Sequence, residues 1–70
     1  MQINLRDVDG KLICVYQSNL VPRIGEKITL NLKGEYKVLD VNYNIALDIN
    51  KPTPTTWVDI TVDYLEVQDD

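Results

Sequence analysis

The chain has 70 residues, 7 of them basic and 11 acidic, and because it has no histidine its formal net charge is −4. The acid excess disfavours general binding to nucleic acid, whose phosphates are held by clustered Lys and Arg, and the lack of histidine and of a second cysteine disfavours a structural metal, a cofactor or a disulfide framework. Val, Ile and Thr supply 20 residues against a single alanine, so we expect one small all-β domain over residues 1–70 without significant helix.

The N-terminal segment is predicted to form a β-hairpin around Asp9-Gly10. This dipeptide suits the positive φ angles of a two-residue turn, and apolar residues alternate on both sides of it. Pairing across the turn predicts a core face made of Ile3, Leu5, Leu12, Cys14 and Tyr16. The opposite face carries apolar residues that we expect to be covered by another chain, forming an interface of Val8, Ile13 and Val15.

A connector is expected over residues 18–25, because Val21-Pro22 and Gly25 interrupt regular strand pairing. A half-buried strand follows, with an apolar face predicted to consist of Ile28, Leu30 and Leu32. The next turn is predicted at residues 33–35.

The returning strand changes the parity of its apolar residues at Val38-Leu39, and such a change indicates a β-bulge. The bulge is expected to place Tyr36 and Tyr43 on opposite faces, so that one ring lies in the core and the other is free to contact a ligand or partner, a role that we assign to Tyr43. Alternation continues to Ile49. Residues 50–56 should then form an exposed loop, because their prolines exclude them from a central strand.

The last predicted strand runs from Trp57 to about Val67, and one of its faces carries Val58, Ile60, Val62 and Tyr64. Leu65 and Val67 switch to the other face. Five or six short strands in so small a chain predict a strongly bent antiparallel sheet closed into a small barrel.

The sequence does not predict an enzyme. Carboxylates are the candidate proton acceptors, but Asp59 and Asp63 on one strand face lie about 13 Å apart, beyond the spacing of roughly 5 to 9.5 Å that paired glycosidase carboxylates use. The three glycines, Gly10, Gly25 and Gly34, lie in separate turns and make no phosphate-binding loop. We therefore expect a protein that binds without catalysis.

Two interpretations of the acidic residues remain open. Asp59, Asp63 and Glu66, with the terminal Asp69 and Asp70, form either a solvated face that keeps the chain soluble or a row of carboxylates that imitates nucleic-acid phosphates.

A candidate ligand site is predicted where two irregular segments carry polar and aromatic groups. Lys51, Thr55 and Thr56 offer a cation and hydroxyl groups beside the indole of Trp57, and Arg23 in the other connector adds a guanidinium. These residues suit a small anionic ligand such as a nucleotide. The alternative is that Trp57 caps the barrel core and Arg23 is solvated.

Two motifs resemble those of short, mostly uncharacterised phage and bacterial proteins that form SH3-like small β-barrels. They are Val21-Pro22-Arg23-Ile24-Gly25-Glu26-Lys27-Ile28 and Tyr36-Lys37-Val38-Leu39-Asp40-Val41. The resemblance implies an SH3-like barrel and a phage setting, in which small acidic proteins bind and block a host protein or sequester a signalling nucleotide as takeover or anti-defence factors. It implies no catalytic residues.

From these observations we expect a binding module in the cytoplasm, the host's cytoplasm for a phage-encoded chain, with no membrane segment. A homo-oligomer is expected as well, because so small a domain gains stability by pairing with a second copy. The alternatives are a minor virion or assembly protein that works by self-association, and a weak nucleic-acid-binding barrel.

Overall fold

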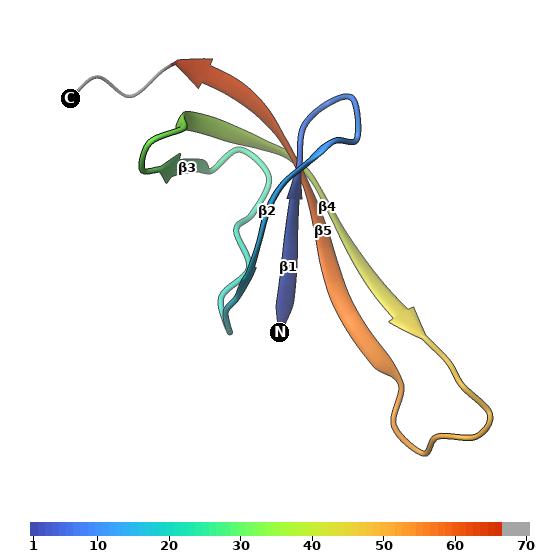
Figure 1. Ribbon diagram of the computed structural model, residues 1–70. Coiled ribbons are helices and arrows are strands. Elements are labelled where there is room, and N and C mark those ends of the chain that lie inside the picture. The colour runs from blue at the N-terminus through green and yellow to red at the C-terminus, as the bar shows by residue number, and fades with distance from the viewer. Residues whose placement is uncertain (67–70) are drawn as a thin grey trace.

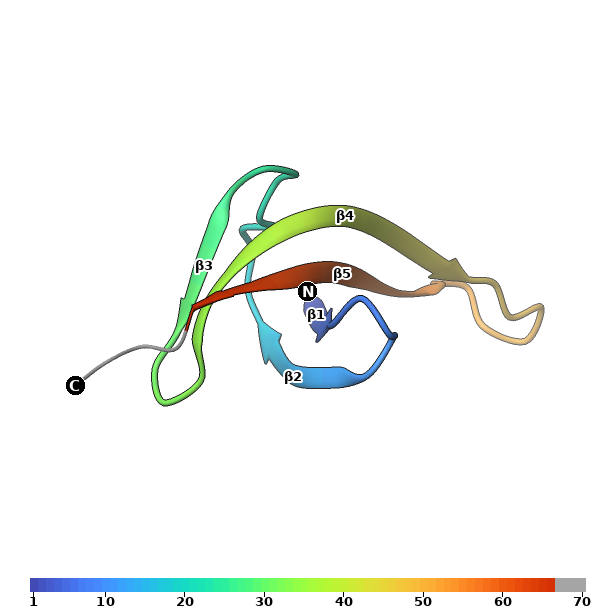
Figure 2. The same ribbon diagram turned by 90° about the horizontal axis from the view of Figure 1, so that it is seen from above.

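The computed structural model describes residues 1–66 and shows an all-β chain (Figure 1). Its strands are β1 (Gln2–Arg6), β2 (Leu12–Gln17), β3 (Lys27–Leu30), β4 (Gly34–Ala46) and β5 (Thr55–Glu66). They form a five-stranded sheet in the order β2-β1-β5-β4-β3, which curls strongly into a half-barrel (Figure 2). The predicted small, strongly bent all-β fold is confirmed, and the half-barrel is consistent with an SH3-like barrel.

Strands β1 and β5, far apart in the sequence, are neighbours in the middle of this sheet. β1 pairs with β5 in parallel, with Ile3 opposite Val58 and Leu5 opposite Ile60, whereas the other three pairings are antiparallel. The parallel pair is an addition to the antiparallel arrangement that the sequence predicted. It makes β5 the central strand, between β1 and β4.

The first hairpin forms where predicted, but its loop is longer. The Gly10 N–H donates to the Asp7 carbonyl at 2.9 Å and Gly10 has φ +85°. This is the three-residue loop in which a turn is followed by a left-handed residue. The Asp7 carboxylate reinforces it by accepting hydrogen bonds from the N–H groups of Asp9 and Lys11, each at 2.9 Å.

The longer loop shifts the register of β2. Cys14 still lies opposite Leu5 as predicted, but Leu12 lies opposite Arg6 and leaves Ile13 as the additional residue of a bulge. The predicted faces of two residues are therefore wrong: Leu12 is exposed, and Ile13 packs against the core instead of lying beside Val15 on the opposite face. Exposed apolar surface remains at Val8 and Val15.

The second turn comes earlier than predicted, because β3 ends at Leu30 and the turn occupies residues 31–33. Leu32 has φ +71° and its side chain is exposed, so the prediction that it belongs to the apolar face of the strand is wrong. The alternation of apolar residues did not reveal the turn, because Leu32 follows Ile28 and Leu30 at the same interval of two residues.

Strand β4 contains the predicted bulge. Its register with β5 shifts between Val38 and Asp40, which leaves Leu39 as the additional residue. Tyr36 accordingly packs against the core and meets the ring of Tyr64 edge-on at 5.3 Å, whereas Tyr43 is exposed. One ring of the pair packs against the core, as expected, but the prediction that the bulge places the two tyrosines on opposite faces is wrong. Tyr36 pairs with Tyr64 and Tyr43 pairs with Val58, so both belong to the concave face, because the additional residue at Leu39 returns positions seven apart to the same face.

Beyond the bulge, β4 and β5 continue as a long hairpin that projects from the half-barrel (Figure 1). We call residues 42–57 the arm. Because of the arm the molecule measures 49 Å in one direction and 19 Å in the other two. The loop at its tip, predicted as residues 50–56, is exposed and begins at residue 47, so Leu47 and Ile49 lie outside the strand that the alternation predicted.

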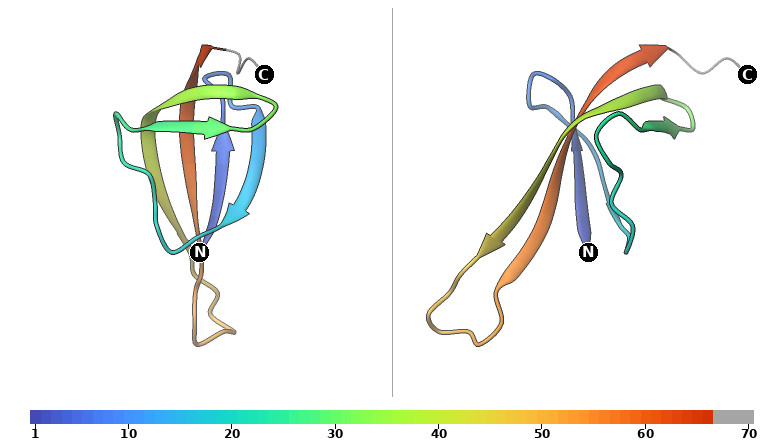
Figure 3. Two further views of the ribbon diagram at one scale, coloured as in Figure 1. Left: turned by 90° about the vertical axis from the view of Figure 1, so that its left-hand side faces the viewer. Right: turned by 180° about the vertical axis from the view of Figure 1, so that it is seen from behind.

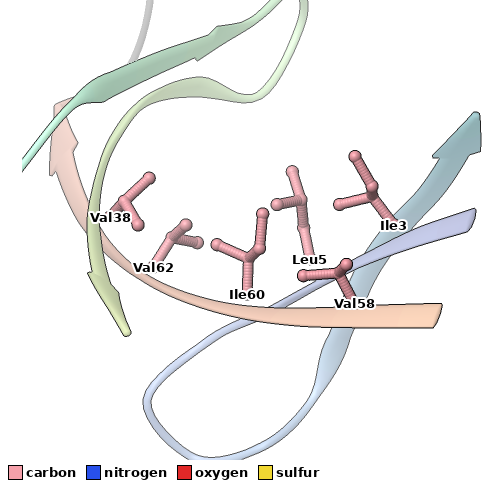
Figure 4. Close-up of a cluster of buried hydrophobic side chains, with 6 residues drawn as sticks. All are labelled: Ile3, Leu5, Val38, Val58, Ile60 and Val62. Atoms are coloured by element: carbon pink, nitrogen blue, oxygen red, sulfur yellow. The ribbon is translucent and has the colours of Figure 1, made fainter. Parts of the chain in front are cut away.

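The core lies on the concave side of the sheet and is small (Figure 4). Its fully buried members come from β1, β4 and β5: Ile3, Leu5, Val38, Val58, Ile60 and Val62. Tyr64, predicted on the same face of β5, is exposed at the end of this row. Within residues 1–66 there is no helix with the length and apolar character needed to cross a membrane.

The connector between β2 and β3 ends in a turn that explains the Pro-x-x-Gly-Glu motif. The Glu26 N–H donates to the Arg23 carbonyl at 3.0 Å, the Glu26 carboxylate accepts the Arg23 N–H at 2.6 Å, and Gly25 has φ +92°. These are the features of a type II turn with glycine at its third position. The motif therefore builds local backbone structure.

Replacing Gly25 by alanine tests this assignment. We expect the free energy of unfolding to fall by about 1 kcal/mol, because an L residue is strained at positive φ, while no atom lies within 4 Å of the added Cβ to cause a clash. Gly25→Asn should cost less, since asparagine tolerates the left-handed region. Urea unfolding followed by Trp57 fluorescence measures both, and equal stability of the wild type and Gly25→Ala would contradict the turn.

Candidate functional site: a groove beside β4

A groove of about 390 Å³ lies between the connector and β4. Residues 21–24 form one wall, and Val41 and Tyr43 form the other. Figure 3 shows the connector passing beside β4 on its way from β2 to β3. The groove therefore joins two segments that are separated in sequence by β3.

Two backbone hydrogen bonds hold the connector against β4. The Gly25 N–H donates to the Val38 carbonyl, and the Val38 N–H donates to the Glu26 carbonyl, both at 2.8 Å. They fix the end of the connector just before the bulge at Leu39. The type II turn then directs residues 21–24 along the strand, so the groove has a preformed backbone wall.

The groove is lined mainly by apolar side chains with a polar rim. Ile24 and Tyr43 expose 65% and 60% of their surface, which is more than aliphatic and aromatic side chains normally leave to solvent in a small fold. Arg23 lies at the rim and contacts Glu26 through an exposed ion pair of 3.8 Å. Such a surface offers apolar contact area, a tyrosine hydroxyl and one weakly engaged guanidinium.

A second hollow, of about 470 Å³, is lined by the same connector and the start of β3. Residues 20–23 form one side of it, and Glu26, Lys27 and Ile28 form the other. It is more polar than the groove, and Leu20 stands exposed at its rim.

The groove adjoins a free sheet edge. β3 pairs only with residues 34–37 of β4, and the connector bonds only Val38. From residue 39 to residue 46, no described strand pairs with the side of β4 that faces away from β5. Alternate backbone N–H and C=O groups on that side are available to an added strand.

The structure brings together only part of the predicted ligand site. Arg23 and Tyr43 share the groove. Lys51 and Thr55 lie at the far end of the arm from the connector, as Figures 1 and 2 agree, and Thr56 follows there at the start of β5. Trp57 belongs to the opposite face of β4–β5 from Tyr43, because it precedes the core residue Val58, which is paired with Tyr43.

The outer face of the sheet carries a hydrogen-bond network that the sequence did not predict, centred on Asp59. One carboxylate oxygen accepts from the Asn4 amide at 3.0 Å and the Arg6 guanidinium at 3.3 Å, and the other accepts from the Asn44 amide at 3.0 Å and the Trp57 indole at 3.2 Å. Asp59 thereby links β1, β5 and β4. Trp57 neither caps the core nor presents a free indole N–H to a ligand.

Amide groups extend this network along two of the strands. Gln2 donates to the side-chain oxygen of Asn4 at 3.0 Å, and Asn42 donates to that of Asn44 at 3.3 Å. Among the described residues, no buried side-chain nitrogen or oxygen lacks a hydrogen-bond partner. One feature of the sequence does point to this network. Asparagines alternate with core residues in β1 and with apolar residues in β4.

The network also sets the charge state of Asp59. The hydrogen bond from Asn4 contributes most to lowering the pKa of Asp59 below its usual value, and those from Trp57 and Arg6 add to it against the opposing effect of partial burial. Because this carboxylate is occupied by internal donors, it is not part of a solvated acidic row. Asp63 is exposed, the side chain of Glu66 is not described, and Asp69 and Asp70 lie outside the described residues.

In the described part of the chain, no three Cys, Asp or Glu side chains are grouped as ligands for a metal ion. No protein-family model matches the sequence, and neither a curated protein nor a solved structure is significantly similar to the chain. The functional argument therefore rests on the groove, the free edge and the arm.

Proposed function

We propose that this chain is a non-catalytic binding module that holds an extended segment of a protein along the free edge of β4. The observation that carries the proposal is the position of an unpaired strand edge directly beside an apolar groove. An added strand gains main-chain hydrogen bonds from such an edge, while pockets beside it select alternate side chains. The two features together are what recognition by strand addition requires.

The exposed apolar residues support a protein as the ligand. Ile24, Tyr43 and Ile45 lie beside or along the edge and are all exposed. Clustered apolar side chains of this kind favour protein contact. A nucleotide is supported less, because the indole predicted to stack on a base donates to Asp59 and lies away from Arg23.

In the phage setting that the motif resemblance implies, the partner is a host protein that the module binds and blocks. The acidic net charge of −4 fits a basic partner surface, and Arg23 can pair with a carboxylate next to the apolar segment.

Affinity capture with matched variants tests the groove. Ile24→Lys places a charge in the groove, whereas Leu47→Lys makes the same change at an exposed position on the arm loop outside it. We expect wild type and Leu47→Lys to retain a common protein from a lysate of the source cells, and Ile24→Lys to lose at least about tenfold of it, as expected for a central interface residue. Equal capture by both variants contradicts the groove as the binding surface.

Hydrogen exchange then locates the bound segment. On adding the purified captured protein, the amides of residues 39–46 should exchange more slowly, because their free N–H groups become hydrogen-bonded. Protection elsewhere with none along this edge contradicts strand addition.

A further inference from the structure

We infer that, when no host protein is bound, the segment held along β4 is β4 of a second copy of this chain, paired antiparallel about a two-fold axis at Tyr43. This inference rests on the proposed function, since it names the occupant of the same edge. It makes the protein a dimer in which each copy supplies both the edge and the strand that pairs with it.

The amino-acid sequence of the edge supports this register, because it is nearly symmetric about Tyr43. Antiparallel pairing about that residue sets Tyr43 opposite Tyr43 of the second copy, Asn42 opposite Asn44, Val41 opposite Ile45 and Asp40 opposite Ala46. Within residues 41–45 each apolar residue meets an apolar residue and each amide meets an amide, and only the outer pair sets the Asp40 carboxylate opposite Ala46. No two like charges face each other in this register. Like charges directly opposite each other would destabilise a cross-strand pair.

The faces of the strand agree with the register. Val41 and Tyr43 lie opposite the core residues Ile60 and Val58, so they belong to the concave face, and Ile45 shares their parity. Asn42 and Asn44 belong to the outer face with Asp59. A two-fold axis preserves this division, because antiparallel strands place directly opposite residues on the same face.

The groove provides a place for one side chain of the second copy. Val41 lines the groove, and the residue opposite Val41 in this register is Ile45 of the second copy. Ile45 is exposed in the single chain. Dimerisation therefore moves two copies of an exposed isoleucine toward two apolar grooves.

Apart from the bulge at Leu39 and the charge of Asp40, the edge has few of the features by which proteins protect an exposed strand from pairing. Lysine, proline and inward-pointing charges are the usual devices, and residues 39–46 contain neither lysine nor proline, with Asp40 as their one charged residue. A two-stranded ribbon is also marginally stable by itself in water. Pairing of two arms converts it into a four-stranded sheet.

Charge substitutions at Ala46 test the register, because Asp40 of the second copy lies opposite. Ala46→Lys creates two attractive pairs per dimer and is expected to tighten dimerisation about threefold to tenfold, whereas Ala46→Asp creates two repulsive pairs and should weaken it by a similar factor. Both residues are exposed, so the fold should tolerate the changes, which circular dichroism checks. Sedimentation equilibrium of the purified full chain, with no other ligand, measures the dissociation constants.

The Asp40→Asn background is the control for net charge. In that background, Ala46→Lys and Ala46→Asp still change the net charge and so the general repulsion between two acidic chains. The additional difference in dimer affinity that comes from pairing with Asp40 should be lost. A dimer whose affinity responds equally to Ala46 variants with and without Asp40 overturns the register.

A wild-type chain that sediments at 8.0 kDa at all concentrations up to about 1 mM overturns the second copy as occupant. That result leaves the proposed function intact when Ile24→Lys still loses a captured heterologous protein. If the wild-type chain does not dimerise and Ile24→Lys captures as much protein as the wild type, the edge is not a binding surface.

Discussion

Replacing Ile60 by alanine is expected to lower the free energy of unfolding by about 3 to 4 kcal/mol, within the range measured for large-to-small changes in cores. Ile60 is fully buried at 0% exposure on the central strand, where it packs with Leu5 of β1. Its truncation removes apolar contacts from a core with six fully buried residues and leaves a cavity that neighbours fill only in part. In so small a domain this is a large share of the total stability.

Ile49→Ala is the matched control, because it makes the same chemical change at a fully exposed position of the arm loop. We expect its effect to lie within about 0.5 kcal/mol of zero. Urea unfolding at neutral pH, followed by Trp57 fluorescence and circular dichroism, measures both variants. Similar losses at the two positions would show that the core does not lie where Figure 4 places it.

Asp59→Asn is expected to destabilise the fold by about 2 kcal/mol, because each disrupted buried or charge-assisted hydrogen bond costs on the order of 1 to 3 kcal/mol and new contacts offset part of the loss. The carboxylate accepts four hydrogen bonds, two at each oxygen. An asparagine keeps one oxygen and turns a donor toward the other two donors. The matched control is Asp40→Asn, an exposed carboxylate on the neighbouring strand, with an expected effect near zero.

The pH dependence of stability separates charge from shape at this position. Because the folded-state pKa of Asp59 is lowered, the stabilisation by its carboxylate is fully present above the unfolded pKa of about 3.9 and is lost as the pH falls toward the folded pKa. Wild type should therefore lose stability more steeply below about pH 4 than Asp59→Asn. Parallel stability curves for the two proteins from pH 5 to pH 2 would contradict a lowered pKa.

The sequence predicted the fold well where alternation is regular. Val58, Ile60 and Val62 were placed on the core face from period two alone, and the parity change at Val38-Leu39 predicted the bulge that the structure contains. These inferences succeed because one face of each segment is buried, so a strand cannot slip by one residue without exposing its core side chains.

Predictions failed where a turn or a bulge changed the count of residues. Asp9-Gly10 suited a two-residue turn, but the Asp7 carboxylate favoured a longer loop and so exchanged the faces of Leu12 and Ile13. A local hydrogen bond decided the register, and period two does not reveal such bonds.

The candidate site was predictable only in part. Residue type alone indicates Arg23 and Tyr43 as binding residues, but the predicted grouping of Arg23 with Trp57 joins two loops that lie at different ends of the molecule. The Asp59 network depends on the parallel pairing of β1 with β5, which brings Asn4 to a residue 55 positions away. Pairing over that distance was not evident from local pattern.

The parallel pair of β1 and β5 has a consequence for how the chain acquires its structure. β1 is synthesised 55 residues before the segment of β5 that pairs with it, so the hairpins made earlier have no central strand to cover until β5 follows. Closing a loop of nearly the whole chain costs entropy before any burial repays it, and topologies of this kind fold slowly. We therefore expect the other strands to depend on β5 for their stable packing.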